Sequence, residues 1–118
     1  MNTLHVTVSN PYDLLIGPGL LAELPSRTES VRNGSQVAII TDDIVADLYL
    51  VQAETAFRQA GSIVSSFAFP NGETSKNIST LSDILEFLAQ NHLRRNDTLL
   101  ALGGGVVGDI VGLAGALY

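Results

Sequence analysis

The feature that most constrains the fold of this chain is a short apolar run that ends in three consecutive glycines. Residues 99–102 (LLAL) have the length and composition of a buried strand, and Gly103-Gly104-Gly105 follow directly. Glycine lacks Cβ, so this turn can adopt positive φ and lets another molecule approach the backbone. Gly103, Gly105 and Gly108 also fit G-x-G-x-x-G, the spacing at which a strand passes into a phosphate-binding helix. The alternative is that the small residues serve tight packing of a helix on a sheet.

Composition limits the protein to a folded domain that is not a nucleic-acid binder. The 118 residues are 46% hydrophobic and 15% charged, which is typical of one globular domain over residues 1–118. Six basic residues and a net charge of −6 argue against nucleic-acid binding. The absence of cysteine excludes disulfides and is in keeping with a cytoplasmic location, and the N-terminal residues show no export signal. Residues 99–118 are apolar, but six glycines and Asp109 make them a poor membrane helix.

The first part of the chain shows strand periodicity. Apolar residues alternate with polar ones over residues 4–9 and 12–16, on either side of Asn10-Pro11, which predicts a half-buried antiparallel ribbon. Leu20–Leu24 fit a short helix that stops near Pro25. A polar loop, Ser26–Ser35, follows.

From residue 36 onward, strand and helix patterns alternate. The segments Gln36–Thr41 and Ser62–Phe69 have the character of buried strands. Between them Ile44–Ala60 fits a helix that ends at Gly61, and a second helical pattern follows the second strand. The first helix is expected to place Leu48, Ala53, Ala56 and Phe57 toward the core, and the second is marked by Ile78, Leu81, Leu85 and Leu88. The predicted fold class is α/β: a Rossmann-like, mostly parallel sheet with flanking helices, preceded by an N-terminal antiparallel β-ribbon.

Polar residues follow each predicted strand, and right-handed crossovers place such residues along one rim of the sheet. Asp42 ends the first strand, where a carboxylate can accept hydrogen bonds from a ribose, although Asp42 or Asp43 can equally cap the next helix. Lys76, oriented by Glu73, can bind a phosphate or ribose oxygen. The alternative is a surface lysine in a loop whose helix cap is Thr74 or Ser75.

Elsewhere the chain shows no catalytic or metal-binding pattern. Charges in the turn Arg94–Asp97 are expected to be solvated. His5 and His92 lack metal-ligand spacing. We therefore predict no catalytic residue and no metal ligand in these 118 residues.

The motifs resemble the N-terminal, NAD-binding part of the 3-dehydroquinate synthase family, within the sugar phosphate cyclase group. The resemblance lies in residues 16–21 (IGPGLL), Thr41-Asp42, Gly72-Glu73 with Lys76, and residues 101–112 (ALGGGVVGDIVG). It implies contacts of Asp42, Glu73 and Lys76 with the adenosine and ribose of NAD, of Gly104, Gly105 and Val106 with the pyrophosphate, and of Asp109 with the nicotinamide ribose or substrate side. The full predicted cofactor-binding set is Asp42, Asn71, Gly72, Glu73, Thr74, Ser75, Lys76, Gly104, Gly105, Val106, Val107, Gly108 and Asp109. Ile44 departs from the family pattern, where many members have Asn.

The resemblance also implies a reaction. The family converts 3-deoxy-arabino-heptulosonate 7-phosphate into 3-dehydroquinate and phosphate with transient use of NAD and a divalent metal, zinc or cobalt. It serves the shikimate pathway and usually forms homodimers. Family residues that bind the metal and the substrate lie beyond the position of Tyr118. We therefore expect this chain to be a truncated domain that binds NAD weakly, is inactive alone and self-associates.

Two other interpretations stay open from the sequence. Metal-dependent alcohol or glycerol dehydrogenases share the fold and a triple-glycine loop, but usually continue with Ser where this chain has Val106. The third interpretation is a non-catalytic, self-associating nucleotide-binding module.

Overall fold

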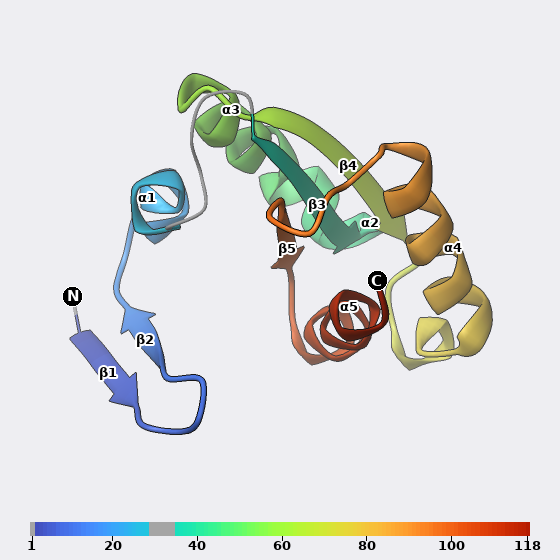
Figure 1. The fold of residues 1–118 in the computed structure, drawn as a ribbon, viewed down its shortest axis with the longest axis horizontal. Coiled ribbons are helices and arrows are strands. Elements are labelled where there is room, and N and C mark those ends of the chain that lie inside the picture. Colours follow the sequence, from blue (N-terminus) through green and yellow to red (C-terminus); the bar gives the residue numbers. More distant parts are fainter. Residues whose placement is uncertain (1, 29–34) are drawn as a thin grey trace.

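The computed structural model describes residues 2–28 and 35–118, and shows an α/β arrangement with a separate N-terminal ribbon (Figure 1). Residues 29–34, which make up most of the predicted polar loop, lie outside the described residues, as does Met1. The strands are β1 (Asn2–Val6), β2 (Tyr12–Ile16), β3 (Gln36–Asp42), β4 (Ile63–Phe69) and β5 (Thr98–Leu102). The helices are α1 (Leu20–Glu23), α2 (Asp43–Val45), α3 (Val51–Gln59), α4 (Ile78–Gln90) and α5 (Gly105–Leu117).

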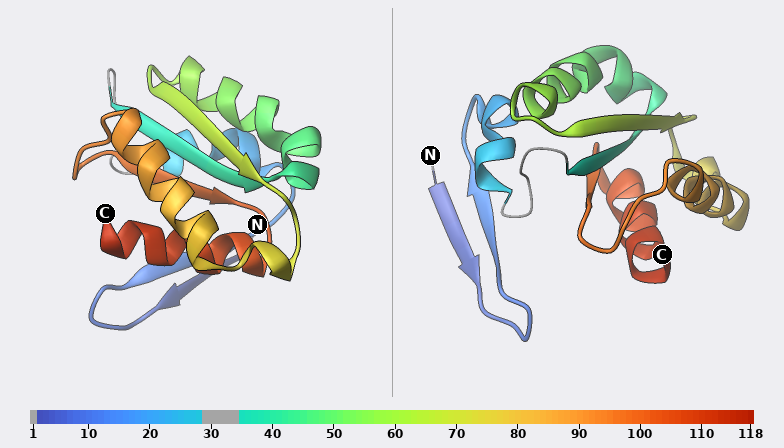
Figure 2. Two further views of the ribbon diagram at one scale, coloured as in Figure 1. Left: turned by 90° about the vertical axis from the view of Figure 1, so that its right-hand side faces the viewer. Right: turned by 45° about the horizontal axis from the view of Figure 1, so that its top comes forward.

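The ribbon pairs as predicted but is not half-buried. β1 and β2 are antiparallel, with Leu4 opposite Leu14 and Val6 opposite Tyr12. Leu4, Tyr12, Leu14 and Ile16 are 45–57% exposed, because the ribbon stands apart from the larger sheet (Figures 1 and 2). The alternation of apolar and polar residues predicted that one face of the ribbon is covered, but no layer of the described residues covers that face.

The larger sheet is parallel and has the strand order β4-β3-β5. β3 is central because it is apolar on both faces: Val37, Ala38, Ile39 and Ile40 are each 0% exposed. The chain runs from β3 to β4 on one side and then crosses to β5 on the other. The connections therefore diverge between β3 and β5, which makes this the switch point of the sheet.

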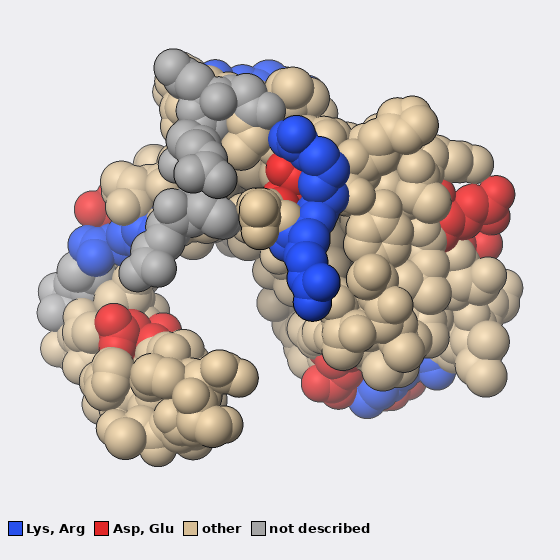
Figure 3. Space-filling model, in the orientation of Figure 1, with Lys and Arg blue, Asp and Glu red and all other residues tan. Residues whose placement is uncertain are grey.

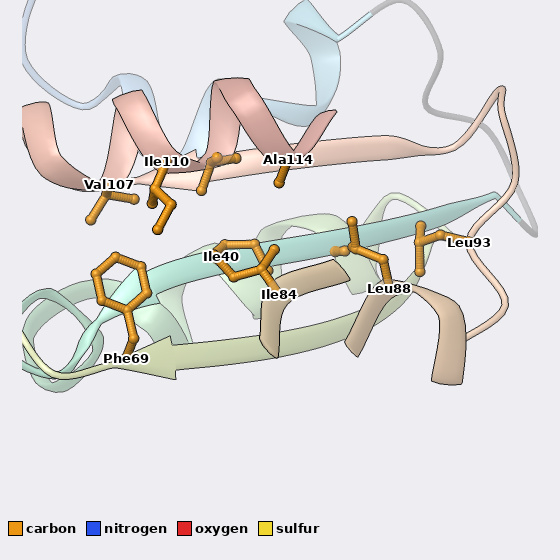
Figure 4. Close-up of a cluster of buried hydrophobic side chains, with 10 residues drawn as sticks. Ile40, Phe69, Ile84, Leu88, Leu93, Val107, Ile110 and Ala114 are labelled. Carbon is orange, nitrogen blue, oxygen red and sulfur yellow. The ribbon is translucent and has the colours of Figure 1, made fainter. Parts of the chain in front are cut away.

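Helices cover both faces of the sheet and divide the core in two. On one face Val37 and Ile39 pack with Ala53 and Phe57 of α3, and with side chains of α1 at the margin. On the other face Ala38 and Ile40 meet α4 and α5 (Figure 4). The residues that α4 and α5 contribute to this cluster are Ile84, Leu88, Val107, Ile110, Val111 and Ala114. The three layers fix the start of α5 relative to the ends of β3 and β4.

The helical region after β3 contains a feature that periodicity missed. Residues 43–59 are helical throughout, but Ala46–Leu50 form a π-helical segment between α2 and α3. A π turn is wider than an α turn, so it rotates the preceding residues relative to α3. Leu48, predicted to face the core, is therefore 64% exposed, whereas Ala53 and Phe57 are buried as predicted and Ala56 is half-buried.

Two glycine signals in the sequence are confirmed, one for a helix end and one for a strand-to-helix turn. Gly61 has φ 93°, and its N–H donates to the Arg58 carbonyl at 3.0 Å, which ends α3. Residues 99–118 form a strand, a turn and a helix, as predicted. None of the described helices is long and apolar enough to span a membrane.

Candidate functional site

The candidate site lies at the rim formed by the carboxyl ends of the parallel strands. Asp42 ends β3, the loop 70–77 follows β4, and Gly103-Gly104 follow β5. The connection through α3 lies on one face of the sheet and α4 on the other. Such a rim, at a switch point, is where open α/β sheets bind ligands.

The glycine loop needs glycine at one position for its own geometry. Gly103 has φ 153°, and a Cβ on it would lie 2.7 Å from Val107 Cγ2. Gly104 and Gly105 are different, because a Cβ on either would meet open space. The same is true of Gly108, one turn into α5. The first turn of α5 therefore presents bare backbone at the rim.

The start of α5 also offers unpaired donors. Its first intrahelical bond is donated by the Gly108 N–H to the Gly104 carbonyl, at 2.9 Å, and no side chain among the described residues caps the helix. The N–H groups of Gly105, Val106 and Val107 precede that bond and point out of the helix. With the helix dipole, they form an environment that favours an anion. Val107 contributes only its backbone, since its side chain is 1% exposed and lies in the core.

Lys76 and Asp109 meet across this rim. Lys76 Nζ lies 2.8 Å from Asp109 Oδ2, and both side chains are exposed. The hydrogen bond and charge of Asp109, with a further contribution from the charge of Glu73, raise the pKa of Lys76 above its ordinary value. The partner in direct contact is thus Asp109, whereas Glu73 acts on Lys76 through its charge, and the orientation of Lys76 by Glu73 stays a prediction. Exposed pairs of this kind exchange partners readily, so Lys76 is available to an anionic ligand.

A groove runs from this ion pair between α4 and α5. Its volume is about 240 Å³. The apolar residues that line it are Ile78, Leu81, Ile110 and Leu113, with Lys76, Asn77 and Asp109 at its polar end.

The neighbouring carboxylates of Asp42 and Asp43 accept hydrogen bonds from different partners. Asp42 Oδ1 accepts the Val45 N–H at 2.8 Å, which confirms the helix-cap alternative for Asp42. Its second carboxylate oxygen makes no hydrogen bond to the described residues, so the predicted ribose contact stays a prediction for that atom. Asp43 instead accepts two hydrogen bonds from Asn71, which lower the pKa of its carboxyl against the opposing effect of desolvation.

Comparison with known proteins shows which proteins this chain is similar to. The family model described as 3-dehydroquinate synthase N-terminal matches residues 66–118. The 3-dehydroquinate synthase of Neisseria gonorrhoeae is 46% identical over 119 residues, which cover 100% of this chain and 33% of the relative. That of Streptococcus suis is 42% identical over 110 residues, covering 93% of this chain and 31% of the relative. The chain is similar to the N-terminal part of 3-dehydroquinate synthases. It spans about a third of the length of these relatives.

Solved structures share the fold of this chain. A 2-deoxy-scyllo-inosose synthase, complexed with carbaglucose-6-phosphate, NAD+ and Co2+, has a TM-score of 0.86 at 23% identity and covers 99% of this chain and 32% of its own. The 2-epi-5-epi-valiolone synthase of Streptomyces hygroscopicus subsp. jinggangensis, with NAD+ and Zn2+ bound, has a TM-score of 0.78 at 27% identity. That match covers 98% of this chain and 31% of the other. The neighbours are sugar phosphate cyclases that carry NAD and a divalent metal.

Within the loop 70–77, some predicted cofactor-binding residues already have internal partners. The hydroxyl of Ser75, which is buried, donates to the Pro70 carbonyl. The cap of α4 is Asn77, which accepts the Thr80 N–H at 2.8 Å, so the cap predicted at Thr74 or Ser75 is wrong. Gly72 takes φ 100°, which favours glycine there. The predicted residues whose side chains are exposed on this loop are Asn71, Glu73, Thr74 and Lys76.

The sequence analysis missed the contacts of two polar residues. Thr41, 0% exposed, donates its hydroxyl to the Leu102 carbonyl at 2.7 Å and so ties the end of β3 to the residue before Gly103. Asp97, at the opposite end of the sheet, accepts the N–H groups of Arg94 at 2.7 Å and Gln36 at 3.1 Å. Its side chain is 3% exposed, so the expectation that it is solvated is wrong. The bond from Arg94 is a local one, in which the Asp side chain accepts the N–H of the residue three positions earlier.

Potential metal ligands are scattered over the described residues. No group of three or more His, Cys, Asp or Glu residues lies close enough together there to hold a metal ion. His5 Nδ1 lies 2.6 Å from Asp13 Oδ1, but this pair sits on the exposed ribbon.

Proposed function

We propose that this chain is the cofactor-binding part of a 3-dehydroquinate synthase and that it binds NAD at the rim described above. The observation that carries the proposal is the open first turn of α5. It lies at the switch point of the sheet, and Gly104, Gly105 and Gly108 leave space where other residues would place a Cβ. The homology to 3-dehydroquinate synthases extends over all of this chain, which supports the same interpretation.

The residues present fit a dinucleotide. Gly104, Gly105 and Val106 would hold the pyrophosphate through backbone N–H groups, as an anion requires. Asp42, Glu73 and Lys76 would bind the adenosine and ribose end, and Asp109 the nicotinamide ribose side. The remaining predicted contacts are Asn71, Gly72, Thr74, Ser75, Val107 and Gly108. Lys76, now paired with Asp109, would also neutralise phosphate charge.

The proposed reaction of the complete enzyme is the conversion of 3-deoxy-arabino-heptulosonate 7-phosphate into 3-dehydroquinate and phosphate, in the shikimate pathway. NAD supplies a reversible acceptor of hydride in this chemistry. The residues of this chain bind and orient the cofactor against one wall. We derive no metal-dependent step from them, because the described residues contain no metal-ligand cluster. We therefore propose that the 118-residue chain does not turn over substrate by itself.

Calorimetric titration with NAD tests the proposal. We expect saturable but weak binding, because the chain provides one wall of a cleft. Gly104→Ala and Gly105→Ala should weaken binding without loss of stability, since the added Cβ meets open space within the protein. Gly112→Ala is the matched control on the same helix, where a Cβ also meets open space. Failure of the unchanged chain to bind, or equal weakening by Gly112→Ala, contradicts the proposal.

The alternative functions make different predictions. A dehydrogenase of which this chain is a part would oxidise glycerol and leave the heptulosonate phosphate unchanged, whereas a structural module would bind no NAD. Neither alternative gains support from the similarities found. We also propose a cytoplasmic location and a homodimer, the latter because the ribbon exposes apolar side chains.

A further inference from the structure

The loop that carries Glu73 and Lys76 is held to the sheet rim by a contact that the sequence analysis did not foresee. Asp43 Oδ1 accepts the Asn71 side-chain Nδ2–H at 2.7 Å and the Asn71 backbone N–H at 3.0 Å. Both donors thus converge on one carboxylate oxygen, from a residue 28 positions away in the chain. The contact joins the start of α2, directly after β3, to the loop after β4.

The loop beyond Asn71 is internally closed, so an anchor at Asn71 places the rest of it. The Ser75 N–H donates to the Gly72 carbonyl at 3.1 Å, and the Ser75 hydroxyl donates to the Pro70 carbonyl. Asn77 Nδ2 donates to the Thr74 carbonyl at 2.7 Å while its Oδ1 caps α4. These bonds make residues 70–77 behave as a unit between β4 and α4.

Asp43 is free to act as this anchor because Asp42 caps the helix. Asp42 Oδ1 takes the Val45 N–H, so the neighbouring carboxylate is left for Asn71. A charged acceptor makes stronger hydrogen bonds than a neutral one. The anchor therefore depends on the carboxylate of Asp43, next to the residue predicted to contact ribose.

We propose that Asp43 is a positioning residue of the nucleotide site: through Asn71 it fixes the loop 70–77, and hence Glu73 and Lys76, relative to Asp42 and the start of α5. This inference rests on the proposed NAD function. Asp43 itself contacts no ligand in this assignment. It lowers the cost of ordering the loop when the ligand binds.

The test uses Asp43→Ala and Asp43→Asn in the 118-residue chain, with Asp47→Ala as the control for loss of an acidic residue one turn later in the same helical run. In the absence of ligand, Asp43→Ala should speed amide hydrogen exchange at residues 71–76 by about tenfold. Asp47→Ala should leave that exchange unchanged. Equal exchange in Asp43→Ala and the unchanged chain overturns the anchor.

Affinity for NAD is the second measurement. Asp43→Ala should weaken binding about two- to tenfold, as for residues coupled in one network, and Asp43→Asn should weaken it less because its amide oxygen still accepts. The double variant Asp43→Asn with Asn71→Asp exchanges the two side chains and keeps a donor opposite an acceptor. It should restore slow exchange at residues 71–76, and affinity is read only from the single Asp43 variants because Asn71 is itself among the proposed contacts.

The outcomes separate the inference from the proposed function. Faster loop exchange with unchanged NAD affinity overturns the positioning role and leaves the proposed function intact. Fast exchange that persists in the double variant overturns the pairing of the two side chains as the anchor. If the unchanged chain binds no NAD, the proposed function fails together with the nucleotide part of this inference, while the exchange measurement still decides the anchor.

Discussion

At the scale of single residues, the glycines of the loop have different reasons to be glycine. Gly103 is required by the fold, because its φ of 153° and the nearby Val107 side chain exclude a Cβ. Gly104 and Gly105 meet no such obstacle. Under the proposed function, their lack of a side chain leaves space for the ligand outside the protein. Neighbouring positions of one motif would then serve the fold and the ligand separately.

This difference predicts opposite results for two substitutions. Gly103→Ala should lower the free energy of unfolding by about 1–3 kcal/mol, the cost of a strained backbone position, with the clash at Val107 in addition. Gly104→Ala should change it by less than about 0.5 kcal/mol. Urea denaturation followed by circular dichroism measures both. Equal stability of the two variants would show that the loop relaxes around Gly103.

At the scale of elements, the turn before β5 is tied to the start of β3 by one carboxylate. Asp97 accepts N–H groups from Arg94 and from Gln36, the first residue of β3. Desolvation raises the pKa of Asp97, but these backbone bonds and the Arg94 side chain outweigh it and hold the pKa below its ordinary value of 3.8. The strand order β4-β3-β5 makes this tie possible, because it places the two strand starts side by side.

The lowered pKa of Asp97 predicts the sign of a pH effect. Its stabilising contribution is fully present above the unfolded-state value of 3.8, and is lost as the pH falls through the lower folded-state value. Asp97→Asn should lower the free energy of unfolding at pH 7 by about 1–3 kcal/mol, and the difference from the unchanged chain should shrink below about pH 4. Denaturation between pH 7 and pH 2.5 tests this. A difference that stays constant over that range contradicts it.

At the scale of the whole molecule, the N-terminal ribbon and the three-layered part differ in burial. The central strand β3 is covered on both faces, whereas the ribbon exposes Leu4, Tyr12, Leu14 and Ile16. On the face shown in Figure 3, the ribbon carries few charged side chains. An apolar surface of this kind favours association with another surface.

We predict that Leu14→Lys weakens self-association of the chain by about tenfold or more, because burying one Leu side chain contributes about 1.5–3 kcal/mol. Val51→Lys is the matched control, since Val51 is 74% exposed on α3, away from the ribbon. Sedimentation velocity over a range of concentrations measures the association. If only Val51→Lys disrupts it, the interface lies on α3; if the unchanged chain is monomeric at all concentrations, the ribbon does not drive association.

The sequence by itself determined the features that depend on neighbouring residues. The ribbon pairing, the alternation of strands and helices, the end of α3 at Gly61 and the strand-glycine-helix junction were all predicted, since periodicity and turn chemistry act over a few residues. The same periodicity predicted the burial of Ala53 and Phe57 correctly. It failed for Leu48, which lies in the π-helical segment and is exposed.

Only the tertiary structure decided which polar groups meet. Lys76 pairs with Asp109, Asp43 with Asn71 and Asp97 with Gln36, at separations of 33, 28 and 61 residues. Strand order and helix packing bring these groups together, and no local pattern encodes either. The same holds for the ribbon, whose alternation specifies an apolar face but not what covers it. The glycine loop could be predicted from the sequence because its constraint is local. The polar side chains that lie beside it at the rim are brought there by the arrangement of the whole sheet.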